Sequence, residues 1–162
     1  MIFFDVTRSL SPMTDINGLH LAYRGLVAGL AGGYVWLATA LLMALPGGNA
    51  LEPLQMLAGG GGSRAETFVT GLLVVQVAAG GIGIGFAYFL ARYFTVRPTL
   101  AVAAPCFAVL AWLAVSSRLG VGGLDPRLQV GLLGAAILYG VMLGAWVPTR
   151  IEVLRPFAAL SH

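Results

Sequence analysis

Four long stretches of this sequence contain no Asp, Glu, Lys or Arg: residues 26–45, 68–91, 99–117 and 130–147. A helix needs roughly 17–25 apolar residues to cross a bilayer core about 30 Å thick. Each stretch is therefore long enough for one crossing. The pattern predicts an all-α integral membrane protein with four transmembrane helices.

The composition agrees with this fold class. Hydrophobic residues make up 59% of the 162 residues and charged residues only 9%, whereas soluble domains contain roughly 25% charged residues. A soluble fold of this length could not cover its surface with so few charges. The net charge of +3 comes from arginines dispersed at the helix ends, which is not a nucleic-acid-binding pattern. We expect membrane lipids and other integral membrane subunits as partners, and no nucleic acid.

Turn-forming residues between the apolar stretches indicate where the helices end. The short connection at residues 92–98 predicts that the second and third helices are antiparallel neighbours. Residues 51–58 could form a short helix on the membrane surface or a loop packed over the bundle. We expect one transmembrane domain over residues 1–162, an up-down bundle with helices at about 16–45, 66–92, 98–118 and 127–147.

The arginines near the helix ends predict the orientation, because cytoplasmic segments of membrane proteins carry more basic residues. Six arginines lie on the side of both termini and three on the other side, which places both termini in the cytoplasm. Residues 1–10 lack the pattern of a cleavable signal, and all basic residues are arginines, so we expect an intact chain in a bacterial inner membrane. The larger set comprises Arg8, Arg24, Arg92, Arg97, Arg150 and Arg155, and the smaller set Arg64, Arg118 and Arg127.

Glycine accounts for 23 of the 162 residues, about twice its usual share of 7%. Much of it recurs at spacings of four, which places small residues on one helix face. Small faces let helix backbones approach closely in lipid. They could pack inside the bundle, or against another subunit, a lipid or a pigment tail. The expected helix-packing residues are Gly25, Gly29 and Gly33, then Gly81 and Gly85, then Ala136, Gly140 and Gly144.

Three further side chains within the apolar stretches invite interpretation. Gln76 is the one strongly polar residue at depth, and we expect it to hydrogen-bond another helix. Tyr139, beside Gly140, is the most plausible buried hydroxyl. Cys106 is expected to be a small buried apolar side chain.

Groups that carry out chemistry are scarce in this sequence. The four stretches hold no carboxylate and no histidine, which disfavours proton or ion coupling. No motif for haem, metal, phosphate or nucleophilic catalysis is present. His20 could ligate one pigment or metal, although a surface histidine is the more common interpretation. We expect no enzyme activity and no intrinsic cofactor, while lipid or pigment tails could bind.

Size and glycine content are similar to those of small four-helix bacterial membrane proteins, some of which are accessory subunits of respiratory or photosynthetic assemblies. We therefore expect a non-catalytic accessory or structural subunit of a larger membrane complex, such as an electron-transfer complex. The alternative is a small oligomeric transporter or channel lined by glycines and Gln76. A lipid-modifying enzyme is disfavoured because catalytic groups are lacking.

Overall fold

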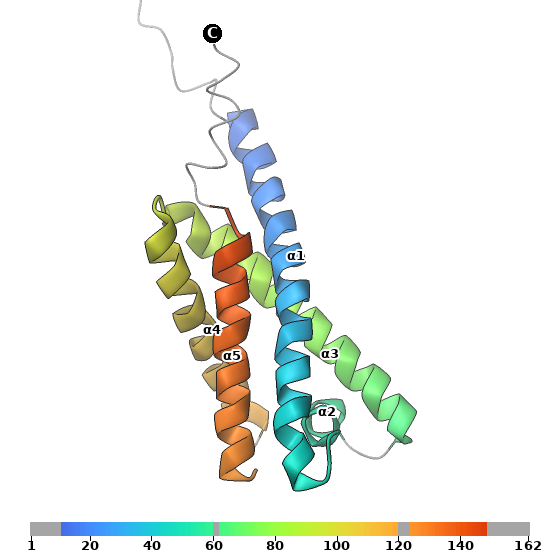
Figure 1. The fold of residues 1–162 in the computed structure, drawn as a ribbon. Helices are drawn as coiled ribbons and strands as arrows, with labels where there is room; N and C mark the ends of the chain where they lie inside the picture. The colour runs from blue at the N-terminus through green and yellow to red at the C-terminus, as the bar shows by residue number, and fades with distance from the viewer. Residues whose placement is uncertain (1–10, 60–61, 120–123, 149–162) are drawn as a thin grey trace, which may run out of the picture.

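The computed structural model describes residues 11–59, 62–119 and 124–148, and within these ranges the secondary structure is helical, with no strand. Four of the described helices are long and apolar enough to cross a membrane. A fifth, short helix lies in the connection between the first two long ones (Figure 1). The helices are α1 (Ser11–Ala44), α2 (Glu52–Ala58), α3 (Arg64–Gly85), α4 (Arg97–Leu119) and α5 (Pro126–Trp146).

Capping groups explain where two of the long helices begin. Before α3, the Ser63 hydroxyl accepts the Glu66 N–H at 3.3 Å, and the Glu66 carboxylate accepts the Ser63 N–H at 2.7 Å. This capping box satisfies two backbone donors that the helix itself leaves unpaired. Before α5, the Asp125 carboxylate accepts the Arg127 N–H at 2.7 Å. Both helices therefore begin one or two residues earlier than predicted.

Two further helix bounds differ from the prediction, namely the start of α1 and the end of α3. Helix α1 begins at Ser11 rather than near residue 16, because its polar first turns continue the helix beyond the apolar stretch. Helix α3 runs on as one turn of π-helix, η3 (Phe86–Leu90), and a short 3₁₀ turn, η4 (Ala91–Tyr93). Such turns accommodate local changes in helix winding.

The four long helices form a row in the order α3, α1, α5, α4. Helix α1 packs against both α3 and α5, and α5 packs against α4 (Figure 1). The two edge helices, α3 and α4, have little contact along their lengths. They come together near their connection, where the rings of Phe86 and Phe107 lie 5.4 Å apart. The predicted packing of these consecutive helices as neighbours is therefore wrong over most of their length.

Helix α2 covers one end of the row. Its Leu54 side chain is completely buried and contacts α3 at Gly71, where an added Cβ would lie 2.8 Å from the Leu54 side chain. The neighbouring Pro53 is also buried. The segment is thus helical, as one expectation had it, and also packed over the bundle, as the other had it.

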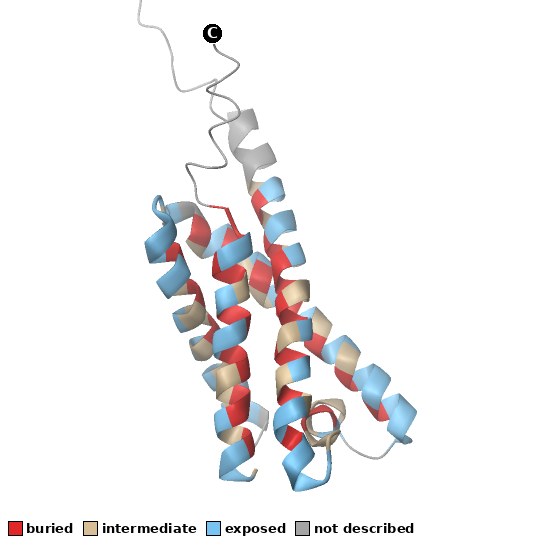
Figure 2. Cartoon of the chain, in the orientation of Figure 1, coloured by how far each residue is buried: buried red, intermediate tan, exposed pale blue. Residues whose placement is uncertain are grey.

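Burial follows the row. Figure 2 shows buried residues where the long helices face one another and exposed residues on their outer sides. Large apolar side chains dominate the outer faces, among them Leu19, Val77 and Val130, each at least 70% exposed. Exposed apolar surface on this scale fits contact with lipid better than contact with water. Cys106 lies on this outer surface, so the expectation that it is buried is wrong.

Candidate functional site

The first candidate region is the seam between α1 and α3, formed by Gly25, Gly29 and Gly33 of α1 against Ala79 and Gly83 of α3. A Cβ added at Gly29 would meet the Ala79 carbonyl oxygen, and one added at Gly83 would lie 2.8 Å from the Gly29 Cα atom. Backbone therefore lies directly against backbone. This stripe of α1 faces another helix of the same chain.

A second seam joins α4 and α5. A Cβ added at Gly140 would lie 2.8 Å from the Ala104 carbonyl oxygen, and one added at Gly144 would lie 3.2 Å from the Ala101 Cα atom. At the end of the seam, Arg97 donates to the carbonyls of Gly144 and Ala145 at 3.2 and 3.1 Å. A cation at a helix C-terminus satisfies carbonyls that the helix leaves unpaired. Arg97 thus ties the start of α4 to the end of α5.

The remaining predicted glycine pair lies apart from both seams. No atom lies within 4 Å of a Cβ added at Gly81 or Gly85. Gly81 is exposed and Gly85 is half-buried. The α3 surface around them is therefore open within the described chain. Small residues at the same spacing of four thus line a helix–helix contact on α1 and an uncovered face on α3.

Gln76 does not make the interhelical hydrogen bond that the sequence predicts. Its amide nitrogen and oxygen are both buried and have no hydrogen-bond partner among the described residues. The side chain points toward Gly33 of α1, where an added Cβ would lie 3.0 Å from the Gln76 Oε1 atom. A glycine offers room but no polar side chain. The amide consequently fills space in the α1–α3 seam without a partner.

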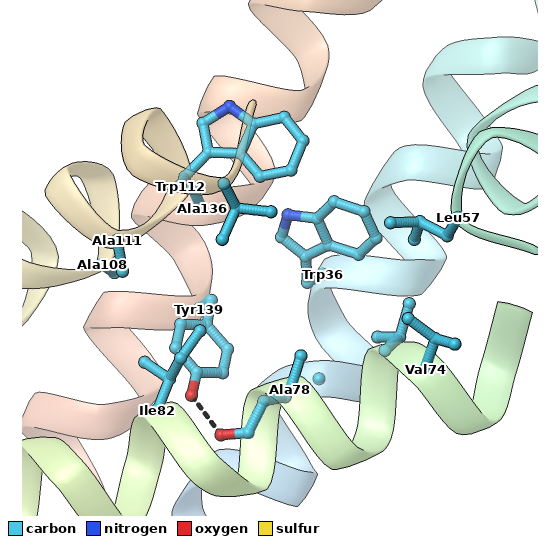
Figure 3. A pocket seen from close by; sticks show the side chains of 14 residues that line it. Trp36, Leu57, Val74, Ala78, Ile82, Ala108, Ala111, Trp112, Ala136 and Tyr139 are labelled. Carbon is cyan, nitrogen blue, oxygen red and sulfur yellow. Dashed lines mark hydrogen bonds between the residues drawn. The ribbon is translucent and has the colours of Figure 1, made fainter. Parts of the chain in front are cut away.

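Tyr139 supplies the polar link that Gln76 does not. Its hydroxyl donates to the backbone carbonyl of Ala79 at 2.6 Å (Figure 3), and its ring is 5% exposed. The bond joins α5 to α3 beside α1. It also satisfies the hydroxyl, which would otherwise be a costly unpaired group at this depth. The expectation of a buried hydroxyl at Tyr139 is confirmed.

An apolar groove lies between the edge helices, where α3 and α4 separate. Its base consists of buried side chains from α1 and α5, and its walls come from α3 and α4 (Figure 3). The rings of Trp36 and Trp112 lie 5.6 Å apart at this groove. The cavity within it measures about 100 Å³. The base includes Gly33, Trp36, Ala136 and Tyr139, and the walls include Val74, Ala78, Ile82, Ala108, Ala111 and Val115.

Sequence reasoning missed this groove. Ala136, expected in a helix-packing stripe, is buried and also lies at the groove base. The spacing of Ala108, Ala111 and Val115 along one face of α4 was the available signal. That signal could not be interpreted without knowing that α3 diverges from α4.

His20 is exposed on the first part of α1. The Arg24 Nε atom donates to the His20 Nε2 atom at 3.2 Å, so this ring nitrogen is already engaged. No three His, Cys, Asp or Glu side chains lie close enough to hold a metal ion within residues 11–59, 62–119 and 124–148. His20 as a pigment or metal ligand stays a prediction. Arg8, Arg150 and Arg155 lie outside the described residues.

Four apolar helices of membrane-spanning length, with apolar outer faces, are the architecture of a multi-pass membrane protein. The chain matches no known family model, and no curated protein or solved structure shows significant similarity to it.

Proposed function

We propose that this chain is a non-catalytic accessory or structural subunit of a larger membrane complex. The observation that carries the proposal is the uncovered small-residue face of α3 at Gly81 and Gly85, which has no neighbour within 4 Å of either added Cβ. Where this chain uses such faces internally, at Gly29 and Gly140, backbones pack directly against each other. A helix of another subunit would find the same close approach on α3.

The arrangement of the helices supports the proposal. Because α3 and α4 stand at the edges of the row, each has a side that no long helix of this chain covers. Helix α4 is the least buried of the four spans. The four apolar stretches also carry no carboxylate or histidine with which to conduct chemistry at depth. Similarity in size and glycine content to small subunits of respiratory or photosynthetic assemblies extends the proposal to electron-transfer complexes.

Gly81→Ile tests this proposal. We expect the variant to fold as the wild type, because the added side chain meets no atom of this chain. We also expect it to leave the larger assembly, since a β-branched side chain would hold a partner helix away. The measurement is native mass spectrometry after mild detergent extraction from the native membrane, with the other subunits identified by their masses.

Gly134→Ile is the matched control, because Gly134 on α5 is equally open but belongs to no predicted stripe. It should leave the assembly intact. Retention of Gly81→Ile in an unchanged assembly would contradict the proposed contact. An assembly made only of copies of this chain would favour the alternative, a small oligomeric transporter or channel.

We further propose an up-down arrangement with both termini in the cytoplasm and the chain in a bacterial inner membrane. Antiparallel seams support the arrangement: Gly25 lies against Gly83 while Gly33 lies against Ala79, and the α4–α5 seam also runs in opposite chain directions. The bias of arginines toward the terminal side supports the orientation.

Cysteine labelling tests this orientation in a Cys106→Ala background. We expect a membrane-impermeant maleimide to label Ser63→Cys in intact cells, because Ser63 is exposed in the connection before α3. Ser161→Cys, outside the described residues, should react only after the membrane is permeabilised. Labelling of Ser161→Cys from outside intact cells would reverse the orientation.

A further inference from the structure

The groove between α3 and α4 is open toward the surroundings of the protein. Its base is buried, with Trp36 at 8% and Ala136 at 3% exposure. Its walls are accessible, with Val74 of α3 at 39% and Val115 of α4 at 42% exposure. Both walls belong to helices that can span a membrane. In a bilayer, the mouth of the groove therefore faces hydrocarbon rather than water.

We propose that this groove binds one acyl chain of an anionic phospholipid, whose phosphate contacts Arg118. The proposal depends on the chain lying in a membrane, and not on its membership of a complex. The lipid would come from the surrounding bilayer, in the leaflet at the end of the row where α2 and the last turn of α4 lie.

The lining selects hydrocarbon. Apart from the Tyr139 hydroxyl and the indole N–H groups of Trp36 and Trp112, the side-chain groups around the groove are apolar, and the Tyr139 hydroxyl already donates to Ala79. Water needs two to four polar partners, so an apolar cavity of this kind stays dry. An empty groove would forfeit the dispersion contacts of its lining. The cavity of about 100 Å³ has room for a short segment of an acyl chain, the rest of which would continue into the bilayer.

The charge at the mouth selects the headgroup. Arg118 follows Val115 by three residues on α4, which places it about one turn further along the same helix side. It is exposed in the last turn of α4, and it has no hydrogen-bond or ion-pair partner among the described residues. Long arginine side chains at helix ends reach into the headgroup layer. The carboxylates of Glu66 and Asp125 each accept a backbone N–H group.

Tryptophan quenching tests the proposal directly. The chain has three tryptophans, so Trp146→Phe leaves only the groove pair Trp36 and Trp112. The protein would be reconstituted into phosphatidylcholine vesicles that contain either phosphatidylglycerol or phosphatidylcholine brominated on an acyl chain. Bromine quenches on contact, so we expect quenching by both lipids. The anionic lipid should saturate at about fivefold lower content, the effect of one basic residue near the membrane surface.

In the same background, Arg118→Gln should raise the phosphatidylglycerol content needed for half-quenching about fivefold. Arg127→Gln is the control, since Arg127 is exposed at the same end of the row on α5 and lies off the groove. It should leave the preference unchanged. Ala111→Phe, which fills the groove from its α4 wall, should reduce quenching by both lipids. Circular dichroism and gel filtration verify that each variant is folded.

Three results would overturn the proposal. An absence of quenching by either lipid would show that no acyl chain occupies the groove, as would be the case if a partner helix filled it. Equal quenching by the two lipids would show that the groove has no preference for an anionic headgroup. If Arg118→Gln left the preference for phosphatidylglycerol unchanged, or if Arg127→Gln lost it to the same extent, the preference would not come from a specific contact with Arg118.

Discussion

Gly29→Ile is expected to break the packing of α1 on α3. A Cβ at this position would meet the Ala79 carbonyl oxygen and would lie 3.2 Å from the Gly80 Cα atom. Both are backbone atoms of a helix, so neither can move aside as the end of a side chain could. Overpacking costs about 1–3 kcal/mol where neighbours can adjust, and this contact should exceed that range. The measurement is the free energy of unfolding of the purified protein during titration with a denaturing detergent.

Gly81→Ile is the control for this experiment as well. It makes the same change in another span, at a glycine whose added Cβ meets nothing within 4 Å. Both variants carry a similar intrinsic effect on helix propensity, so their difference isolates the seam. We expect Gly81→Ile to unfold near the wild-type detergent concentration. Equal stability of the two variants would show that α1 and α3 do not pack backbone to backbone.

The four long helices could be predicted because their signal is local. A stretch of apolar residues without charge, such as 68–91, has few alternatives to a membrane span, whatever surrounds it. The bounds were less certain because polar residues can extend a helix beyond the bilayer core. Helix α1 therefore begins at Ser11, and capping at Ser63 and Asp125 moved two other starts.

The order of the helices could not be predicted, because it depends on which faces meet. Gly29 and Gly81 belong to stripes with the same spacing, yet Gly29 lies in a seam and Gly81 is uncovered. The spacing of small residues shows that they share one helix face, but it does not show which helix packs against that face. The groove was harder still to predict from the sequence, because it exists only where α3 and α4 diverge. Trp36 and Trp112 come together there from spans that are not adjacent in the chain.

The same limit explains the incorrect expectation for Gln76. A polar side chain in a membrane helix commonly bonds a neighbouring helix, so the general rule favoured a partner. The partner depends on the residue opposite, which here is Gly33. Tyr139 of α5 belongs to no recognisable motif, yet its hydroxyl donates to the Ala79 carbonyl. The general rule holds for polar residues in membrane helices as a class, whereas the residue that packs opposite Gln76 determines whether this particular amide has a partner.

Gln76→Leu is therefore expected to stabilise the isolated protein rather than weaken it. The two side chains are similar in size, so the seam against Gly33 should remain filled. The substitution removes two buried polar atoms that have no partner among the described residues. A buried unpaired polar group costs about 1–3 kcal/mol. We expect the free energy of unfolding to rise by about 1 kcal/mol, at the lower end because the unfolded chain in detergent also leaves polar groups poorly solvated.

Gln129→Leu provides the comparison for this prediction. It makes the same chemical change at an amide that has a partner, since the Gln129 Nε2 atom donates to the Leu124 carbonyl at 2.9 Å. Loss of that bond should lower the free energy of unfolding by about 0.5–1.5 kcal/mol. The two substitutions are thus expected to act in opposite directions in the same titration. If Gln76→Leu also lowers stability, then the Gln76 amide has a partner that lies outside the described part of the chain.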